Sequence, residues 1–451
     1  MIHQDTIAAI ATPQGEGGIL IIRVSGSGAK RVFQRCFQRA NKGEIQSHRL
    51  YFGHVTDEQN AHLDEAMGVF MSAPNSYTRE DVCELHCHGG RLLAQRVLSR
   101  VLKEDCRLAQ PGEFTRRAFL NGRIDLSEAE AVMDLIGAGS EQAARSALNQ
   151  LEGGVSHFVM GLKDRLTDLL SLIEAGNDFP EEIEEQDIKE QVREQTIEIA
   201  ALLRQASDED AARIVRDGIS VALVGTPNVG KSSLLNALLK QDRAIVTPLP
   251  GTTRDVLTER LHVNGMLIEL SDTAGQRDAG DEVEQIGIDR ARKTQHNADL
   301  VLLVLDSSRP LEDEDRQLLK QVDDRTLIVL NKTDIQQGAG IDQTQFPSGI
   351  QTASVCALTG EGIDSLLHRI CDMFAPQESV ERQMTVQRHI TCARDAAAAL
   401  DRVVLSIDQG DPVDLCAIDL MQALSTLSEI TGESATESVI DRIFARFCVG
   451  K

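Results

Sequence analysis

The sequence contains no tryptophan and only two tyrosines, Tyr51 and Tyr77. Proteins that bind single-stranded nucleic acids commonly stack the bases on aromatic side chains, so a stacking platform is not expected here. A surplus of positive charge is also absent, since the formal net charge is −24. This charge argues against a broad nucleic-acid-binding surface, which needs clustered lysine and arginine. It is compatible with a local RNA contact, and an RNA substrate would then require a basic partner protein.

Long apolar runs are missing as well, because no stretch approaches the roughly 20 residues that a membrane-spanning helix needs. The first residues carry no basic patch leading into an apolar run, so we expect no secretory signal. The nine cysteines are scattered, and none forms a Cys-x-x-Cys pair. Such usage is typical of reduced thiols. We therefore expect a cytoplasmic protein without membrane association.

The pattern of apolar residues changes along the chain and predicts a multidomain protein, as its 451 residues allow. Residues 1–118 mix short β-like runs with glycine- and proline-marked turns, which predicts an α+β domain. Residues 119–215 and 376–451 have helical periodicity. Between them, residues 216–375 alternate apolar runs with amphipathic stretches, as doubly wound α/β domains do. The order predicts a discontinuous helical domain with the α/β domain inserted. The strands expected in that domain are Ile219–Val224, Met266–Leu270, Leu300–Leu305 and Leu327–Leu330.

A glycine-rich stretch, Gly225 to Ser232, fits the phosphate-loop pattern G-x-x-x-x-G-K-[ST]. It follows the expected strand Ile219–Val224 and opens the expected helix Lys231–Lys240, which is the context that the motif requires. Its glycines allow backbone N–H groups at the start of the helix to surround phosphates. We predict that Lys231 contacts the β- and γ-phosphates and that Ser232 binds Mg²⁺.

Three further motifs follow in the order found in GTPases. In Asp272-Thr273-Ala274-Gly275, the aspartate would lie near Mg²⁺ and the glycine N–H near the γ-phosphate. In Asn331-Lys332-Thr333-Asp334, Asp334 would accept two hydrogen bonds from guanine N1–H and N2–H₂, a pattern that adenine does not offer. Cys356-Ala357 is expected to end the next strand, in place of the usual Ser-Ala. These motifs predict that the nucleotide is GTP.

The segment from Thr247 to Asp255 lies at the place of a first switch, where Thr253 would complete the Mg²⁺ shell. The predicted nucleotide contacts are Asn228, Val229, Gly230, Lys231, Ser232, Ser233, Thr247, Pro248, Leu249, Pro250, Gly251, Thr252, Thr253, Asp272, Thr273, Ala274, Gly275, Asn331, Lys332, Asp334, Cys356, Ala357 and Leu358.

Several motifs together resemble one family. The Gly251-Thr252-Thr253-Arg254-Asp255 switch, Asn228 and the terminal Phe447-Cys448-Val449-Gly450-Lys451 are similar to those of the MnmE (TrmE) family of bacterial and organellar tRNA-modifying GTPases. The first third adds matching motifs, so that the resemblance covers the whole chain: Pro74–Thr78, His88–Gly90, Pro111–Phe114 and Arg123–Leu126. It implies that residues 1–118 form a tetrahydrofolate-binding and dimerisation domain. It also implies a Ras-like GTPase domain and a helical domain that ends in Cys-Val-Gly-Lys.

The resemblance implies a reaction as well. Family members work with an FAD-containing partner, MnmG, and add an aminomethyl or carboxymethylaminomethyl group at C5 of the wobble uridine of certain tRNAs. They form homodimers through the N-terminal domain, and 5-formyl- or methylene-tetrahydrofolate supplies the carbon. The folate contacts carry over to Arg23, Glu84, Arg123 and Lys451. These charges suit folate, because a pterin donates hydrogen bonds to a carboxylate and the glutamyl tail attracts cations.

The family uses K⁺ where other GTPases use an arginine finger. By resemblance, its ligands are Asn228, Thr247, Thr252 and the backbone of Leu249. Pro248 and Pro250 depart from the pattern, since proline has no N–H to donate.

Two residues are candidates for orienting the water that attacks the γ-phosphate. Gln276 occupies the position of the Ras-like glutamine, whereas the family uses a glutamate that maps to Glu284. We favour Glu284, and it stays open whether Gln276 also orients the water. The predicted catalytic residues are therefore Glu284, Lys231 and Cys448. Cys448 is either a reactive thiol or a small buried residue.

One further cluster and two other functions are compatible with parts of the sequence. Cys83, His86, Cys87 and His88 have a spacing that fits no structural zinc pattern, so no metal is expected there. A GTPase that only assembles ribosomes would have no need of a folate-type domain with the terminal motif. A plain folate-dependent aminomethyltransferase would not need a nucleotide switch. A GTP-hydrolysing enzyme of tRNA modification is therefore the favoured hypothesis.

Overall fold

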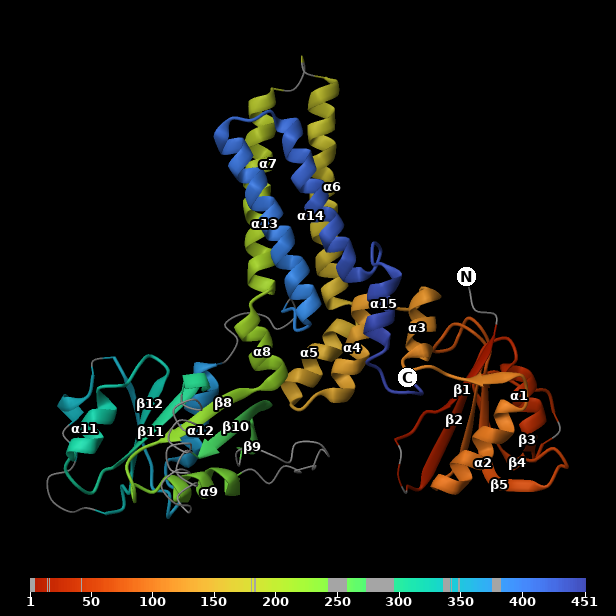
Figure 1. Ribbon diagram of the computed structural model, residues 1–451, viewed down its shortest axis with the longest axis horizontal. Coiled ribbons are helices and arrows are strands. Elements are labelled where there is room, and N and C mark those ends of the chain that lie inside the picture. The colour runs from red at the N-terminus through yellow and green to blue at the C-terminus, as the bar shows by residue number, and fades with distance from the viewer. Residues whose placement is uncertain are drawn as a thin grey trace, which may run out of the picture. The chain divides into compact units, whose positions relative to one another are not determined.

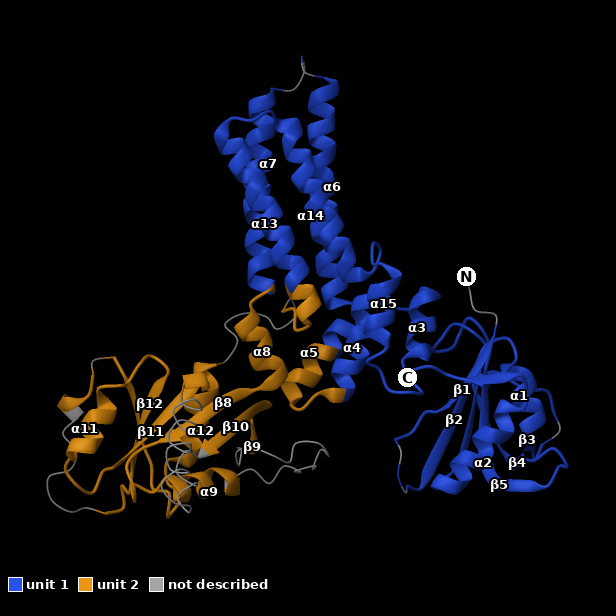
Figure 2. Ribbon diagram, viewed as in Figure 1, with its two compact units in different colours: residues 1–136, 148–206, 391–451 blue, residues 137–147, 207–390 orange. Residues whose placement is uncertain are grey.

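The computed structural model describes residues 5–13, 15, 17–41, 43–179, 181, 184–241, 258–272, 296–335, 341, 343–347, 349–374 and 383–451. The chain divides into two compact units (Figure 2). Unit 1 comprises residues 1–136, 148–206 and 391–451, and unit 2 comprises residues 137–147 and 207–390. Both units are therefore assembled from separate stretches of the chain. The finer division into domains at residues 118, 215 and 375 stays a prediction.

Unit 1 contains a seven-stranded sheet in the order β3-β4-β5-β6-β2-β1-β7 (Figure 1). Its strands are β1 Thr6–Ile10, β2 Ile19–Ser25, β3 Phe37–Arg39, β4 Arg49–Thr56, β5 His62–Met71, β6 Val82–His88 and β7 Cys106–Leu108. Neighbouring strands run antiparallel, apart from β1 and β7, which are parallel. Side chains alternate along each strand between the two faces of the sheet, and β1 is buried on both faces: Ala8 packs in one cluster, and Ile7 and Ala9 pack in another.

Helices α1 (Ala29–Cys36) and α2 (Arg91–Leu102) cover one face of this sheet. Phe33 of α1 and Val97 of α2 are fully buried against Ile22 and Leu85 of the sheet. A third helix, α3 (Glu113–Leu120), follows β7. Helices packed on one face of a mostly antiparallel sheet form an α+β architecture, which confirms the expected class for the N-terminal part.

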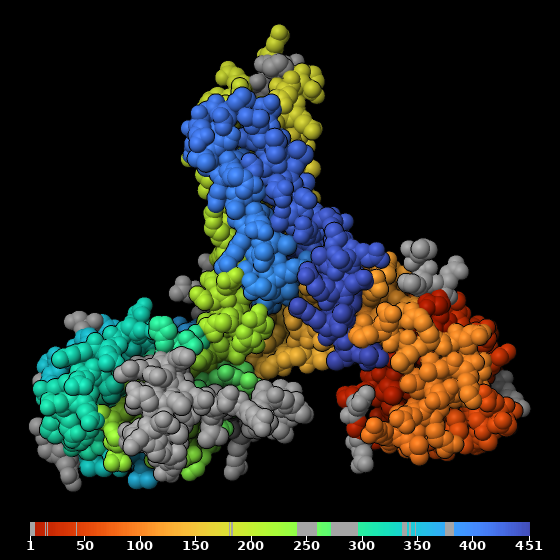
Figure 3. Space-filling model, in the orientation of Figure 1, coloured from red at the N-terminus to blue at the C-terminus, as the bar shows by residue number. Residues whose placement is uncertain are grey.

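Most of the remaining residues of unit 1 are helical. The helices are α4 Leu126–Gly137, α6 Gly154–Asp178, α7 Glu185–Ala206, α13 Gln387–Gln409, α14 Val413–Thr431 and α15 Glu437–Phe444. Helix α5 (Glu141–Leu151) is shared between the units, since residues 141–147 belong to unit 2. Helix α14 packs against α6 and α7, and Figure 3 shows the blue C-terminal residues on the near side of the bundle. The ion pairs Arg193–Asp408 and Arg402–Asp419 join α7 to α13 and α13 to α14. The helical domain built from two distant halves of the chain is thus confirmed.

Unit 2 contains a six-stranded sheet in the order β13-β12-β11-β8-β10-β9. Its elements are α8 Glu209–Asp217, β8 Ile219–Val224, α9 Lys231–Gln241, β9 Thr258–Val263, β10 Met266–Asp272, β11 Leu300–Asp306, α11 Asp313–Leu319, β12 Thr326–Asn331, η1 Gln343–Gln345, β13 Gln351–Ser354 and α12 Ile363–Met373. The pairs are parallel except for β9 with β10. The four strands expected from the sequence are confirmed, and β8 has the expected bounds.

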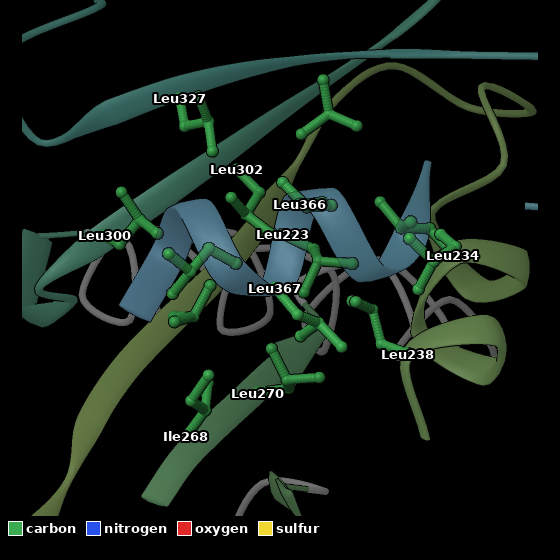
Figure 4. Packing of buried hydrophobic residues seen from close by; sticks show 14 of the residues in the cluster. Leu223, Leu234, Leu238, Ile268, Leu270, Leu300, Leu302, Leu327, Leu366 and Leu367 are labelled. Carbon is green, nitrogen blue, oxygen red and sulfur yellow. The ribbon is translucent and has the colours of Figure 1, made fainter. Parts of the chain in front are cut away.

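Helices cover both faces of this second sheet. On one face, Leu234 of α9 and Leu366 of α12 pack against Leu223 of β8 (Figure 4). On the other, Leu319 of α11 packs against Leu305 of β11. Parallel strands covered on both faces need apolar residues at nearly every position, and β11 is buried throughout. This arrangement is the predicted doubly wound α/β domain.

Residues 137–147 belong to unit 2 although they precede the main part of it by some distance in the chain. A backbone hydrogen bond of 2.9 Å from Gln142 N to Gly265 O joins this segment to the turn between β9 and β10. In the described parts of the chain, no helix is both long and apolar enough to cross a membrane.

Candidate functional site

The carboxyl ends of the parallel strands of unit 2 carry the predicted nucleotide residues. Strand β8 leads into Gly225, β10 ends at Asp272 and β12 ends at Asn331. In the register of the sheet, Asp272 lies opposite Leu223 of β8, one residue before that strand ends. Ligands of open α/β sheets bind beyond the carboxyl ends of the strands. The fold therefore brings motifs that are far apart in the sequence to one edge of the sheet.

The phosphate loop, Gly225 to Ser232, connects β8 to α9. Asn228 and Gly230 have φ angles of 63° and 98°, which turn the backbone back toward the start of the helix. A Cβ at Gly230 would overlap the side-chain amide of Asn331, so glycine is required at this position. The N-terminus of a helix entered in this way presents N–H groups and positive potential to an anion.

Lys231 is buried within the loop. Its Nζ donates to the carbonyl oxygens of Gly225 and Thr226, at 2.8 Å each. The ammonium group is therefore held inside the curve of the backbone, where a lysine of this motif meets the β- and γ-phosphates. Ser232 and Ser233 follow it in the first turn of α9 and are exposed.

The predicted base-reading segment is tied to the phosphate loop by hydrogen bonds. Asn331 Nδ2 donates to Val229 O at 2.9 Å, and Asn331 Oδ1 accepts from Ala357 N at 3.0 Å. Lys332 Nζ donates to Asn228 O at 2.8 Å. These contacts fix the base-reading loops and the phosphate loop relative to one another, so the base and the phosphates of one nucleotide would be held together.

Asp306, at the end of β11, anchors the same lysine. Lys332 Nζ lies 2.6 Å from Asp306 Oδ2, and Ser308 donates to Oδ1 from both its N–H and its hydroxyl. Burial alone would raise the pKa of Asp306, but these hydrogen bonds lower it below its ordinary value. The carboxylate is thus ionised at neutral pH and holds Lys332 in place. No sequence motif pointed to Asp306.

Asp334 is exposed and is contacted by Cys356. The Cys356 thiol donates to Asp334 Oδ1 at 3.1 Å and accepts from Thr359 N at 3.4 Å. Strand β13 ends at Ser354, so the expectation that Cys356-Ala357 ends the strand is wrong by two residues. Cys356 lies in the following turn because its N–H bonds to Glu361 O, which closes a loop in front of α12. Leu358, at the tip of this loop, is 86% exposed.

The remaining predicted residues of the nucleotide site lie outside the described part of the chain. They are Thr247, Pro248, Leu249, Pro250, Gly251, Thr252, Thr253, Thr273, Ala274, Gly275, Gln276 and Glu284.

Three of the predicted folate residues come together in unit 1. Arg23 of β2 lies opposite Glu84 of β6, and its Nε donates to Glu84 Oε1 at 2.8 Å. The guanidinium groups of Arg23 and Arg123 lie 5.8 and 4.6 Å from the centre of the Tyr77 ring. Arg123 Nη1 also donates to Tyr77 O at 3.0 Å. Cation–π contacts with the same ring hold the two arginines near each other, and Arg23 is bonded to the carboxylate.

His86, which is not among the predicted folate residues, completes this cluster. His86 Nε2 lies 3.1 Å from Glu84 Oε2, so both carboxylate oxygens have a partner. The hydrogen bond with His86 and the charge of Arg23 outweigh burial and lower the pKa of Glu84. The sequence spacing indicates this contact, since His86 follows Glu84 by two positions in a strand and therefore shares its face. Tyr77 lies in the family motif Pro74–Thr78, to which the sequence assigned no ligand contact.

The C-terminal tail lies against the same part of unit 1. Gly112 N donates to Cys448 O at 3.3 Å, and Phe447 is buried in a cluster with Leu126. A Cβ at Gly450 would overlap the carbonyl oxygen of Ile10, whose strand partner is Ile22, next to Arg23. The last residues thus run beside β1, close to the charged cluster. Cys448 is exposed, which excludes the interpretation of a small buried residue.

The cysteines and histidines of β6 lie on opposite faces of the strand. Cys83 and Cys87 are buried under α1 and α2, whereas His86 bonds to Glu84 on the other face. His88, on that face too, bonds to Asp64 through Nδ1 at 2.8 Å. Cysteine and histidine ligands that point in opposite directions do not share one metal ion. Among the described residues, no group of His, Cys, Asp and Glu has the geometry of a metal site.

Comparisons with known proteins match both units. The family model described as GTP-binding protein TrmE N-terminus matches residues 6–123, and the MnmE helical domain model matches residues 126–448. A tRNA modification GTPase MnmE of Pediococcus pentosaceus is 43% identical over 456 residues, which cover 99% of this chain and 98% of the relative. A tRNA modification GTPase MnmE of Geotalea uraniireducens is 44% identical over 461 residues, and the match covers all of this chain and all of the relative.

Solved structures match parts of the chain. The G domain of the T. maritima FeoB iron transporter is 29% identical, with a TM-score of 0.26, and the match covers 35% of this chain and 99% of that one. Aquifex aeolicus Era bound to GDP·AlF4⁻ is 24% identical, with a TM-score of 0.29, over 40% of this chain and 66% of that one. The full-length relatives establish the family of this chain. The chain belongs to the MnmE family of tRNA modification GTPases and is an enzyme that hydrolyses GTP in tRNA modification.

Proposed function

We propose that this GTPase is stimulated by K⁺ and acts with an FAD-containing MnmG partner on the wobble uridine of certain tRNAs. The pair would add an aminomethyl or carboxymethylaminomethyl group at C5, with the carbon taken from 5-formyl- or methylene-tetrahydrofolate. The observation that carries the proposal is the cluster of Arg23, Glu84, Arg123 and Tyr77 beside the C-terminal tail. A GTPase that only assembles other particles has no use for such a cluster.

The cluster has the chemistry that folate requires. An ionised carboxylate accepts the paired N–H donors of a pterin, and the arginines attract the glutamyl tail. The Arg23 and Glu84 side chains are 21% and 15% exposed, so they are partly shielded from water yet reachable. Charge-assisted hydrogen bonds are stronger in such surroundings than on an open surface. Lys451, at the end of the tail beside β1, is the fourth proposed contact.

The roles in the nucleotide site follow from the side chains. Lys231 would neutralise the β- and γ-phosphates, and Asp334 would select guanine. Ser232 and Thr253 would hold Mg²⁺. Asn228, Thr247 and Thr252, with the backbone of Leu249, would hold the K⁺ that offsets charge developing between the phosphates. Of these residues, Asn228 has the left-handed backbone that curls the loop.

The assembly and the location belong to the proposal too. We infer a homodimer that forms through the N-terminal domain and that acts in the cytoplasm. With a net charge of −24, the chain by itself would bind tRNA weakly, so MnmG would supply most of the positive surface.

Mass spectrometry of wobble uridines tests the function as a whole. A strain that lacks this protein should lose the C5 substituent, and the wild-type gene should restore it. A gene that carries Arg23→Ala should not restore it, because folate would lose a cation and Glu84 would lose its partner. Restoration by Arg23→Ala would contradict the folate proposal, while an unmodified wild-type control would invalidate the assay.

The salt dependence of hydrolysis tests the K⁺ proposal. We expect hydrolysis to be specific for GTP and to fall about 10-fold or more when K⁺ is replaced by Na⁺, since the smaller ion fits the proposed ligands poorly. Phosphate release in matched KCl and NaCl buffers measures this, with choline chloride as the control for ionic strength. Equal rates in K⁺ and Na⁺ would remove K⁺ from the mechanism.

The two candidates for orienting water make opposite predictions. Glu284→Ala should lose most hydrolysis, about 100-fold or more, with GTP affinity kept, because it removes the group that positions the nucleophile. Gln276→Ala should change the rate only about 2-fold. Single-turnover hydrolysis and nucleotide titrations of both variants decide between them. The reverse outcome would assign the chain a Ras-like mechanism.

A further inference from the structure

Two side chains outside the GTPase motifs, the half-buried Arg309 and the buried Asp315, contact Thr226, the second residue of the phosphate loop. Thr226 Oγ1 donates to Asp315 Oδ1 at 2.9 Å. Arg309 Nη1 donates to Asp315 Oδ2 at 2.7 Å, and its Nη2 donates to Thr226 Oγ1 at 3.3 Å. Thr226 and Asp315 are only 6% and 1% exposed. The three side chains form a closed hydrogen-bonded triangle.

The carboxylate of this triangle is fixed to a helix. Asp315 lies in the first turn of α11, where its Oδ2 also accepts from Glu312 N at 3.1 Å as part of a capping box. Burial alone would raise the pKa of Asp315, but the bonds from Arg309, Glu312 and Thr226 lower it. A buried carboxylate is costly without partners, so the removal of one partner disturbs the whole set. Both the charge and the position of Asp315 are thus determined by its surroundings.

The phosphate loop needs supports of this kind because its backbone provides the ligands. Phosphates are bound by N–H groups whose directions depend on a strained, glycine-dependent path. If the path were mobile, binding would have to order it, which weakens affinity. Asn331 and Lys332 already hold the carbonyls of Val229 and Asn228 in the second half of the loop. In the first half, Lys231 bonds to the carbonyls of Gly225 and Thr226, and the triangle holds the side chain of Thr226.

We propose that Asp315 and Arg309 are positioning residues of the nucleotide site, which hold Thr226 so that the loop keeps the curvature that binds phosphates. The inference rests on the proposed phosphate loop and adds α11 to the elements that determine nucleotide affinity. Because the loop surrounds the β-phosphate, the contribution is specific to GDP and GTP. GMP, which has no β-phosphate, is bound without it.

The test compares affinities for GDP, GTP and GMP, by competition with a fluorescent GDP derivative on the full-length chain. Thr226→Val keeps the shape of the side chain and removes its hydroxyl, and Asp315→Asn removes the charge. Each should raise the Kd for GDP and GTP about 10-fold, the usual effect of breaking a buried charged hydrogen bond. GMP affinity should change less than about 2-fold, since GMP has no β-phosphate. Thr226→Ser, which keeps the hydroxyl, should bind as wild type.

Two further variants make the outcome decisive. Glu314→Gln changes an exposed carboxylate in the same turn of α11 and should have no effect. The double variant Thr226→Val/Asp315→Asn should bind GDP no more weakly than the weaker single variant, because both substitutions disrupt the same hydrogen-bonded triangle. Additive losses, or equal losses for GMP and GDP, would overturn the proposal, since they indicate a general disturbance of the fold. Unchanged GDP affinity in Thr226→Val, which leaves the Arg309–Asp315 pair intact, would overturn it as well.

Lys231→Ala separates this inference from the loop assignment on which it rests. If Lys231→Ala weakens GDP while Thr226→Val and Asp315→Asn do not, only the role of the triangle is lost. If Lys231→Ala also leaves GDP affinity unchanged, the phosphate-loop assignment itself is wrong.

Discussion

The nucleotide region of unit 2 and the charged cluster of unit 1 are built in different ways. In unit 2, the groups that would bind phosphates are backbone N–H groups of one continuous loop, and side chains such as Asn331 serve to hold that loop. In unit 1, the ligand would meet the side chains of Arg23, Glu84 and Arg123, which come from three distant segments. A backbone site leaves a fixed local spacing in the sequence. A side-chain site depends on the register of the sheet and leaves no such spacing.

The chemistry proposed for the C-terminal tail gives the largest expected difference between the two units. Cys448→Ser should abolish the modified wobble uridine and leave GTP hydrolysis near the wild-type rate, because a hydroxyl is a far poorer nucleophile than a thiolate. Both activities and the thermal midpoint would be measured on one sample. Cys106→Ser, at a half-buried cysteine, is the matched control. Full modification by the Cys448→Ser variant would reduce the thiol to a structural role.

The charged cluster should respond to the loss of one charge without any effect on the nucleotide. Glu84→Gln should raise the Kd for 5-formyl-tetrahydrofolate about 10- to 100-fold, since a neutral amide replaces a carboxylate in charge-assisted hydrogen bonds. GTP affinity should stay the same, and calorimetry with each ligand measures both. Glu65→Gln, on the same side of the sheet but exposed, is the control. A parallel fall in GTP affinity would show that the two sites are not independent.

The same carboxylate predicts a pH dependence. The pKa of Glu84 is lowered, so the group stays ionised as pH falls and loses its charge only below the ordinary range of glutamate. Folate affinity should therefore hold between about pH 7 and pH 5, as far as Glu84 determines it. An affinity that falls steeply above pH 5 would mean that another group controls binding.

The base-reading loop should show the smallest effect. Cys356 donates a thiol hydrogen bond to Asp334, where most GTPases use serine. Cys356→Ala should raise the Kd for GTP about 3- to 10-fold, since Asp334 loses a hydrogen-bond donor. Cys356→Ser should bind GTP at least as tightly as wild type, because hydroxyls are stronger donors than thiols. Nucleotide titrations of the two variants measure this. Equal affinity of the alanine and serine variants would show that the thiol does not position Asp334.

Much of the fold followed from local patterns. Strands β8, β10, β11 and β12 were predictable because a strand covered on both faces is a short, nearly continuous apolar run. The edge strand β9 was not predicted, since Thr258–Val263 begins with three polar residues and has no continuous apolar run. Residues 137–147 were not expected in unit 2, because the hydrogen bond from Gln142 to Gly265 leaves no pattern in either segment.

The sequence alone determined the family, the fold class and the order of the GTPase motifs. Each of these depends on residues close together in the chain, whose spacing reflects one loop, one helix or one strand. The tertiary structure decided which distant side chains meet. The register of β2 with β6 brings Arg23 to Glu84 and gives His86 its role, and the packing of α11 brings Asp315 to Thr226. These pairings cannot be read from spacing, because they result from how whole elements pack to bury their apolar faces.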